Sequence, residues 1–343
     1  MKKVAVALSG GIDSAVTAYL LKQQGYKVTG VFLRLTENQP PYSPSNIAKL
    51  LKIDYIELDL KDIFKKEIIK PFIETYLLGK TPNPCIWCNQ KIKFGILLKE
   101  IKKMGFDFLA TGHYARKIFK NNRFILLRGI DQQRDQSYFL FPLTQEQLSH
   151  ILWPLGTINK EKTKKIAISI GLCLNTKESR EICFIPERNY RLFLEKHAKE
   201  RLTKEGKILN LEGKVIGKHS GIWRYTIGQR HGLGIRGREA YYVRVIDADK
   251  NCLIVAPRQA LFFKEAIVEN VNFFPFDSLK EPLYVSVKIR YKQIETKALI
   301  KPINEKKVQI IFETPQFAVT PGQAAVFYQD EVCVGGGWII SAK

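Results

Sequence analysis

The sequence predicts an α/β domain with a parallel sheet, followed by two small β-rich domains of which the last is a β-barrel. Two observations predict this organisation. In the first half, short apolar runs typical of strands alternate with amphipathic stretches typical of helices, as in a parallel sheet covered on both faces. After about residue 200, glycine becomes frequent, helical periodicity disappears, and short alternating runs predict the strands of small sandwiches or barrels.

The expected elements follow in chain order. Strands of the first half are expected at residues 4–8, 27–35, 55–58 and 108–111. Helices are expected at residues 15–24, 46–51, 63–78, 91–103 and 160–171. Later strands are expected at residues 241–246, 253–256, 283–291, 307–312 and 324–328. We therefore expect three domains, at residues 1–198, 199–262 and 263–343.

The charge balance points to a polyanionic partner. The chain of 343 residues carries 55 Lys and Arg against 33 Asp and Glu, a formal net charge of +22. Nucleic acid is the first candidate partner and an anionic membrane surface the second. The alternative is a general lysine bias, because many lysines lie on expected solvated helix faces such as residues 61–70.

The lengths of the apolar runs and the number of cysteines indicate the cellular compartment. No apolar run approaches the length of a membrane span, and the short run after Met-Lys-Lys is typical of a buried strand rather than a signal peptide. Six cysteines in a chain of this size do not make a disulfide scaffold. We expect a cytoplasmic protein without a membrane partner.

A glycine-rich loop separates the first expected strand from the first expected helix. Such a turn directs backbone N–H groups and the positive end of a helix at one spot, which suits a phosphate. Gly10 and Gly11 let the backbone approach closely and adopt positive φ. A carboxylate repels phosphate, so Asp13 fits if it orients the loop or holds a bridging Mg²⁺ ion. The loop residues are Ala7, Leu8, Ser9, Gly10, Gly11, Ile12, Asp13 and Ser14.

This loop differs from the kinase-type phosphate loop because it contains no lysine. Its Ser-Gly-Gly-x-Asp-Ser pattern resembles the PP-loop of ATP pyrophosphatases, which cleave ATP between the α and β phosphates. The alternative is a glycine turn that binds nothing. Ligands of parallel sheets lie beyond the carboxyl ends of the strands, where Leu33, Gly112 and His113 are also expected.

Two cysteines are candidates for chemistry. Cys85 and Cys88 form a C-x-x-C after a rigid proline turn, and a helix is expected to begin nearby. A helix N-terminus and adjacent lysines would favour the thiolate of Cys88. The pair could also be half of a zinc site, but no second pair completes it, and we expect no metal. By local sequence alone, Cys183 is typical of a buried strand cysteine. Three others are expected to be packing residues: Cys173, Cys252 and Cys333.

With these motifs together, the chain resembles the bacterial tRNA-specific 2-thiouridylase family over nearly its whole length. The loop at residues 9–14 is shared with many ATP pyrophosphatases, but the full combination in this order is specific. The other shared motifs lie at residues 81–89, 93–94, 110–114, 134–138, 182–184, 225–234, 290–291 and 321–323. The resemblance implies an adenine nucleotide alpha hydrolase-like PP-loop fold and a tRNA sulfurtransferase.

The resemblance also implies a mechanism. ATP, with Mg²⁺, adenylates O2 of a tRNA wobble uridine and releases pyrophosphate. A persulfide-bearing sulfur-carrier protein loads Cys183, and sulfur from that persulfide replaces AMP at C2. Cys88 is the partner nucleophile, which forms a disulfide with Cys183 or attacks more directly. The target base must be extruded from its stack. Enzymes of this kind can work as monomers.

The same resemblance assigns substrate contacts. It implies that Asn83, Pro84 and Cys85 line the base pocket, with His113 and Gln323 flanking it. One assignment has independent support, because Lys288, Arg290 and Lys292 alternate along an expected strand and would share one face. A phosphate-tracking stripe and a solvated edge strand are both compatible with that pattern. The expected tRNA contacts are Arg134, Asp135, Gln136, Arg290 and Tyr291.

The chain departs from the family pattern in two places. The stretch after residues 33–35 is shorter than usual and lacks an acidic, Cys-containing segment. Cys85 stands where some members have Asp, and it could be a spare thiol able to form a short disulfide with Cys88. Two rival functions stay open: another PP-loop enzyme that activates a small metabolite, and a non-catalytic RNA-binding sulfur carrier or zinc module.

Overall fold

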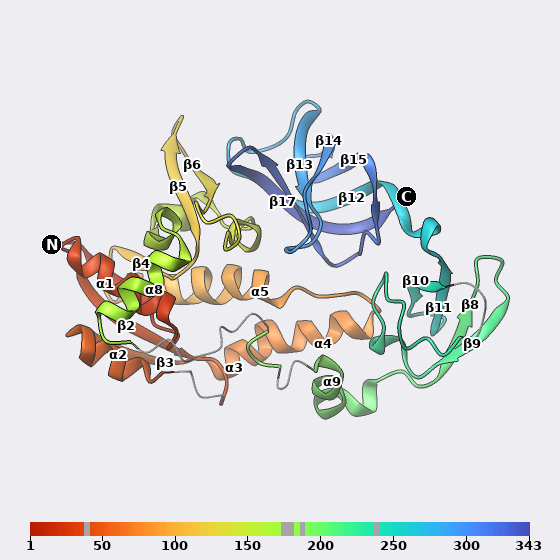
Figure 1. The fold of residues 1–343 in the computed structure, drawn as a ribbon, viewed down its shortest axis with the longest axis horizontal. Helices are drawn as coiled ribbons and strands as arrows, with labels where there is room; N and C mark the ends of the chain where they lie inside the picture. The colour runs from red at the N-terminus through yellow and green to blue at the C-terminus, as the bar shows by residue number, and fades with distance from the viewer. Residues whose placement is uncertain (38–41, 173–181, 186–188, 236–239) are drawn as a thin grey trace. The chain divides into compact units, whose positions relative to one another are not determined.

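The computed structural model describes residues 1–37, 42–172, 182–185, 189–235 and 240–343 (Figure 1). The chain forms two compact units. The first unit comprises Met1–Ile68, Cys85–Phe184 and Gln329–Val334. The second comprises Ile69–Pro84, Ile185–Tyr328 and Gly335–Lys343.

A five-stranded parallel sheet with strand order β3-β2-β1-β4-β7 forms the centre of the first unit. This confirms the predicted parallel sheet. From β1 the chain moves outward to β2 and β3, then returns to the other side of β1 with β4. The strand order therefore reverses between β1 and β4, which is where ligands of such sheets bind. The strands are β1 (Lys3–Ala7), β2 (Lys27–Arg34), β3 (Asp54–Asp59), β4 (Phe108–Ala110) and β7 (Ile151–Leu152).

Helices α1, α2 and α8 pack apolar side chains against β1 and β2, and α8 lies beside α1 (Figure 1). Two expected helices, at residues 63–78 and 91–103, contain wider π-type turns at Lys65–Ile69 and Cys88–Leu97. No helix in the described part of the chain is long and apolar enough to cross a membrane. The helices are α1 (Ile12–Gln23), α2 (Pro44–Leu51), α3 (Lys61–Phe64), α4 (Lys70–Leu77), α5 (Pro84–Trp87), α6 (Leu98–Lys103), α7 (Gln145–Ser149), α8 (Lys160–Ser169) and α9 (Tyr190–Ala198).

An antiparallel hairpin in the first unit was not predicted. It consists of β5 (Ala115–Lys120) and β6 (Arg123–Arg128), joined through Asn121 and Asn122, which adopt φ of 51° and 58°. Positive φ at both central residues matches the right-handed twist of the strands, and asparagine tolerates it. The Asn-Asn pair was the available signal for this hairpin.

In the second unit, a four-stranded sheet has the order β10-β11-β8-β9. Its buried side chains, among them Ile208, Val243 and Leu253, form a separate small core. Helix α9 packs on α4 through aromatic pairs, with the Tyr76 and Tyr190 rings stacked at 4.7 Å. The strands are β8 (Gly206–Leu209), β9 (Val215–His219), β10 (Tyr241–Asp247) and β11 (Cys252–Pro257).

The last six strands form a closed antiparallel barrel, as predicted. Their order is β12-β15-β14-β13-β16-β17, and pairing of β12 with β17 closes it. The expected strand at residues 283–291 is wrong at its end, because β13 stops at Lys288 and a turn follows. The strands are β12 (Phe262–Phe273), β13 (Leu283–Lys288), β14 (Thr296–Asn304), β15 (Lys307–Phe317), β16 (Ala324–Gln329) and β17 (Val332–Ala342).

Candidate active site

The glycine loop follows β1 at the point where the strand order of the parallel sheet reverses. Gly10 adopts a φ of 76°, a conformation that strains other residues. The Ser14 hydroxyl accepts the Ser9 N–H at 3.1 Å and donates to the Gly11 carbonyl at 2.8 Å, which closes the turn. The N-cap residue of α1 is Gly11, which has no side chain to cap the helix. The first N–H groups of α1 therefore suit an anion, as the motif predicts.

Asp13 is the centre of a hydrogen-bond network in this loop. The Lys160 ammonium donates to both carboxylate oxygens of Asp13, at 2.7 and 2.9 Å. The Tyr114 hydroxyl donates to Asp13 Oδ1 at 2.9 Å and lies 3.0 Å from the Thr163 hydroxyl. Burial, and next the Asp13 charge, raise the pKa of Tyr114, so its proton stays in place. These contacts support an orienting role for Asp13.

Sequence reasoning missed Lys160 and the contact that Tyr114 makes. Lys160 lies 147 positions after Asp13, at the start of α8, and no recognised motif surrounds it. Its side chain is only 8% exposed, whereas that of Asp13 is 36% exposed. A buried lysine is rare unless its charge is paired, but burial cannot be read from one sequence.

The end of β4 touches the loop through Gly112. A Cβ atom at Gly112 would lie 2.9 Å from the Asp13 carbonyl carbon and 3.0 Å from the Ser14 nitrogen. Only glycine allows this approach without a backbone shift. Leu33 lies half-buried near the end of β2 and pairs with Leu58 of β3. The role of Leu33 and Gly112 in nucleotide binding stays a prediction.

The three candidate thiols all belong to the first unit. Cys85 lies half-buried on α5, and Cys88 lies buried at the start of the π-type turns. Cys183 is exposed in a turn, so the expectation of a buried strand cysteine from local sequence was wrong. All three are thiols, and the disulfide between Cys88 and Cys183 stays a prediction. Of the expected packing cysteines, Cys252 and Cys333 are buried and Cys173 lies outside the described residues.

Burial dominates the electrostatics of these thiols. It raises the pKa of Cys88 to about 12, and nearby Lys93 lowers that pKa by less than burial raises it. Burial, and next the proximity of Cys183, raise the pKa of Cys85 to about 11. The residue Cys183 is exposed as a whole, but the protein around its thiol desolvates the sulfur and raises its pKa, and Lys93 lowers that pKa by less. Lys93 favours the Cys88 thiolate, as expected, but desolvation outweighs it and the net shift favours the thiol.

The His113 ring is buried near Lys93. Burial holds the pKa of His113 well below its ordinary value, and the charge of Lys93 lowers it further by a smaller amount. The ring is therefore neutral. His113 Nδ1 is 2.7 Å from the Thr111 hydroxyl, and its ring contacts Phe94. Asn89 donates to the Phe139 carbonyl at 3.4 Å, while its buried Oδ1 has no hydrogen-bond partner in the described structure. Asn89 was not among the predicted site residues.

In the second unit, Gln323 anchors the proline turn that precedes the C-x-x-C. Its amide donates to the carbonyls of Thr81 and Pro82, at 2.9 and 3.3 Å. Asn83 is half-buried and Pro84 is buried in the same turn. The structure therefore gives Gln323 a clear supporting role, and base contacts by Asn83, Pro84 and Gln323 stay predictions.

Two expected tRNA contacts serve the fold in this structure. The buried Asp135 carboxylate accepts the N–H groups of Gly129 and Ser137, at 3.0 and 3.1 Å, and the Ser137 hydroxyl at 2.8 Å. Gln136 Oε1 accepts the Tyr114 N–H at 3.0 Å. Asp135 is buried by these contacts, and its contact with tRNA stays a prediction. Arg134, half-buried beside them, stays a candidate.

The expected basic stripe of the barrel does not form. Because β13 ends at Lys288, Arg290 and Lys292 lie in the following turn rather than alternating along a strand. The Arg290 guanidinium donates to the Ala318 carbonyl at 2.8 Å and to the Thr320 hydroxyl at 2.9 Å. Arg290 thus ties two barrel loops together. Tyr291 is half-buried, and its contact with RNA stays a prediction.

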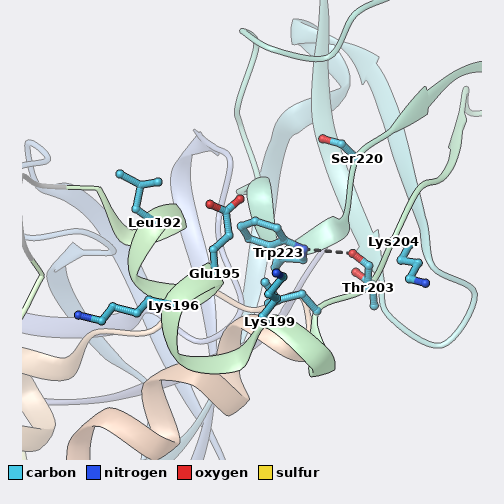
Figure 2. A pocket seen from close by; sticks show the side chains of 9 residues that line it. Leu192, Glu195, Lys196, Lys199, Thr203, Lys204, Ser220 and Trp223 are labelled. Atoms are coloured by element: carbon cyan, nitrogen blue, oxygen red, sulfur yellow. Dashed lines mark hydrogen bonds between the residues drawn. The ribbon is translucent and has the colours of Figure 1, made fainter.

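Two further features lie outside the predicted site. Among the described residues, no group of three or more His, Cys, Asp or Glu could hold a metal ion. A shallow pocket of about 620 Å³ lies in the second unit, between α9 and the segment around Trp223 (Figure 2). Lys196 and Lys204 on its rim extend in opposite directions, so they do not converge on one ligand. None of the predicted site residues lines it.

Three family models match the chain in succession. A tRNA methyl transferase HUP domain matches residues 2–187, and a tRNA methyl transferase PRC-barrel domain matches residues 191–257. An aminomethyltransferase beta-barrel domain matches residues 263–339. Together with the parallel sheet and the closed barrel, these matches confirm the predicted order of an α/β domain followed by two small β-rich domains.

Whole-length relatives are also found. The chain is 43% identical to tRNA-specific 2-thiouridylase MnmA of Clostridium acetobutylicum, covering 98% of this chain and 99% of that protein. It is 43% identical to tRNA-specific 2-thiouridylase MnmA 1 of Caldanaerobacter subterraneus subsp. tengcongensis, covering 98% and 97%. The structure of NMN synthetase from Francisella tularensis covers 50% of this chain and 62% of its own, at 15% identity. Its TM-score of 0.32 is too low to support an argument.

Proposed function

Because the chain belongs to the tRNA-specific 2-thiouridylase family, we propose that it catalyses ATP-dependent 2-thiolation of the wobble uridine of tRNA. ATP adenylates O2 of the uridine with loss of pyrophosphate, and sulfur then displaces AMP from C2. One observation carries this proposal. A phosphate-type loop at the N-terminus of α1 and the three free thiols Cys85, Cys88 and Cys183 occur in the same compact unit.

The loop is suited to the nucleotide half of the reaction. The uncapped start of α1 and the positive φ of Gly10 offer backbone N–H groups to the phosphates of ATP. Adenylation is needed because the O2 oxygen of uracil is a very poor leaving group, whereas AMP is a good one. Mg²⁺ is expected to accompany ATP. We assign it no protein ligand, because both oxygens of Asp13 accept hydrogen bonds from Lys160.

The thiols are suited to the sulfur half. Exposure of Cys183 supports its loading with a persulfide by a sulfur-carrier protein. In one route, Cys88 attacks Sγ of Cys183, forms the disulfide and expels hydrosulfide, which attacks C2 and displaces AMP. In the other, the terminal persulfide sulfur attacks C2 first, and Cys88 then releases the thiolated base. Both routes leave a Cys88–Cys183 disulfide that an external thiol must reduce.

Burial of Cys88 adds a requirement to either route. With a pKa near 12, Cys88 is protonated at neutral pH, so its proton must leave as it attacks. In the first route, the departing hydrosulfide is a base that can accept this proton. The high pKa also protects Cys88 from reaction before the persulfide is in place.

The charge of the chain is suited to a tRNA substrate. A net charge of +22 favours binding to the phosphate backbone, and such binding weakens as salt rises. Two of the matched family models are described as methyl transferase domains, which raises methyl transfer as a second activity. Methyl transfer needs neither cleavage of ATP to AMP and pyrophosphate nor a pair of thiols, so the site favours thiolation.

Nucleoside mass spectrometry of reacted tRNA tests the proposal. Purified protein, ATP, unmodified tRNA and a persulfide donor are expected to yield 2-thiouridine at the wobble position, with one AMP formed per thiolated base. Methylated nucleosides, or thiolation that proceeds without ATP, would contradict the proposal. Omission of the persulfide donor is the control, because it should leave pyrophosphate release intact while the tRNA gains no sulfur.

A further inference from the structure

We infer that Lys160 binds the pyrophosphate part of ATP, as the lysine that the loop itself lacks. The inference rests on the proposed function, since it concerns the nucleotide of that reaction. Kinase-type loops place a lysine inside the loop motif, and residues 7–14 contain none. The fold instead brings Lys160 to the first turn of α1 from 147 positions away.

The backbone around Lys160 fixes its position. Asn159 caps α8 by accepting the Lys162 N–H at 2.8 Å, and the Lys160 N–H donates to the Asp131 carboxylate at 2.9 Å. The helix of ten residues packs beside α1 (Figure 1). The Lys160 side chain crosses to Asp13, and its ammonium lies 5.8 Å from the centre of the Tyr114 ring. This side chain is therefore held in one direction, toward the loop.

The local charges indicate that the site is built for an anion. The Lys160 ammonium lies at the start of α1, where the helix dipole is also positive. The single negative charge of Asp13 faces both the Lys160 ammonium and the positive end of the α1 dipole. The first turn of α1 therefore keeps an excess of positive charge. A lysine at a helix N-terminus is unfavourable for the helix alone, and a phosphate would offset that cost.

Asp13 gives Lys160 a second role in the same site. Its carboxylate would otherwise repel phosphate, and the ammonium neutralises it at 2.7 Å. Two functions of Lys160 must therefore be separated by experiment. Neutralising Asp13 supports the loop for any nucleotide, whereas binding pyrophosphate supports only nucleotides that carry the β and γ phosphates.

Calorimetric binding of two ligands separates these functions. The first ligand is an ATP analogue with a methylene bridge between the α and β phosphorus atoms, and the second is AMP. Lys160→Met is expected to weaken analogue binding by on the order of 30-fold or more, and AMP binding by less than about threefold. Lys162→Met is the matched control, because Lys162 is exposed on the same helix, and both affinities should stay as in the wild type.

Two more variants keep the result interpretable if Lys160→Met is poorly folded. Lys160→Arg retains the charge and the contact with Asp13, and should bind both ligands within about fivefold of wild type. In Asp13→Asn with Lys160→Met, no unpaired carboxylate is left. If Lys160 only neutralises Asp13, this double variant should recover analogue binding. We expect that it does not.

The outcomes separate this inference from the function on which it rests. Equal losses for the analogue and AMP, no loss in Lys160→Met, or recovery in the double variant would each overturn the role of Lys160 while leaving the thiolation proposal standing. Failure of the wild-type protein to bind the analogue at all would overturn the proposed function and this inference together.

Discussion

The nucleotide loop and the thiol cluster both lie in the first unit, yet they depend on different properties of the chain. The loop acts through backbone groups, and its geometry follows from glycine at position 10 and from the serine contacts of the turn. The thiols act through their ionisation, which follows from burial and from Lys93. A short motif therefore predicts the loop, whereas the state of the thiols depends on the whole fold.

The largest effects are expected from removing the thiols. Cys88→Ser and Cys183→Ser should each abolish tRNA thiolation, because neither serine can form or resolve a persulfide. Pyrophosphate release that requires tRNA should continue at close to the wild-type rate. Nucleoside analysis and a pyrophosphate assay on the same samples check both statements.

Cys85→Ser is the matched variant for that experiment. We expect it to retain most of the thiolation activity, since Cys85 is assigned to neither sulfur route. A loss as complete as that of Cys88→Ser would show that the assignment of the nucleophile is wrong or incomplete.

Alkylation by iodoacetamide tests the ionisation of the buried Cys88 thiol. Because burial raises the pKa of Cys88 to about 12, its alkylation rate should rise about tenfold per pH unit between pH 7 and 10. An ordinary thiol levels off near pH 9. Peptide mass spectrometry resolves each cysteine, and the exposed Cys183 should be modified before Cys88 at pH 8. A Cys88 rate that levels off below pH 9 would contradict the described environment.

A change at Asp13 tests the loop in the same way. Asp13→Asn keeps the shape but removes the charge that holds Lys160 and Tyr114. We expect tRNA-dependent pyrophosphate release to fall on the order of 10²-fold, by analogy with losing one positioned group of an active site. Thermal unfolding of the same variant is the control for folding. Wild-type release by a folded Asp13→Asn protein would remove Asp13 from the account.

A smaller effect is expected from Gly112→Ala, which pushes β4 against the loop. The added Cβ would lie 2.9 Å from the Asp13 carbonyl carbon, so the loop must shift, at a cost of about 1–3 kcal/mol. Pyrophosphate release should fall about tenfold, the equivalent of 1.4 kcal/mol. Gly217→Ala is the control, because its Cβ would meet nothing closer than 3.5 Å. Equal effects of the two substitutions would contradict the close approach.

The smallest effects distinguish two basic residues of the barrel. Arg290→Ala should lower the free energy of unfolding by about 2 kcal/mol, because it loses donors to the Ala318 carbonyl and Thr320 hydroxyl. Lys292→Ala, at an exposed turn position, should change stability by less than about 0.5 kcal/mol. Denaturant titration measures both values. If Lys292 contacts a phosphate, its removal should also reduce the salt dependence of tRNA binding by a slope of about one.

Much of the fold could be predicted because its signals are local. Apolar runs followed by helical periodicity indicated the parallel strands, and frequent glycine with short alternating runs indicated the later β-rich domains. The errors also have local causes. The sequence alternates through residues 287–292, which led us to extend the strand too far. In the structure β13 ends at Lys288, and Arg290 in the following turn bonds Ala318 and Thr320.

The site was predictable only where a motif fixes the chemistry. The loop residues follow one another in sequence, so their pattern could be recognised. Lys160 could not be recognised, since only the packing of α8 beside α1 brings its ammonium to Asp13. The pKa of Cys88 was predicted in the wrong direction, because proximity to Lys93 can be inferred from sequence and the depth of burial cannot.

The proposed function requires that this chain use ATP to activate a base of tRNA. Pyrophosphate release from ATP by the purified protein, with and without unmodified tRNA and without any sulfur source, tests it most directly. We expect release only when tRNA is present. Release without tRNA would contradict the claim in favour of an enzyme that activates a small metabolite, and no release under either condition would contradict it in favour of a non-catalytic RNA binder.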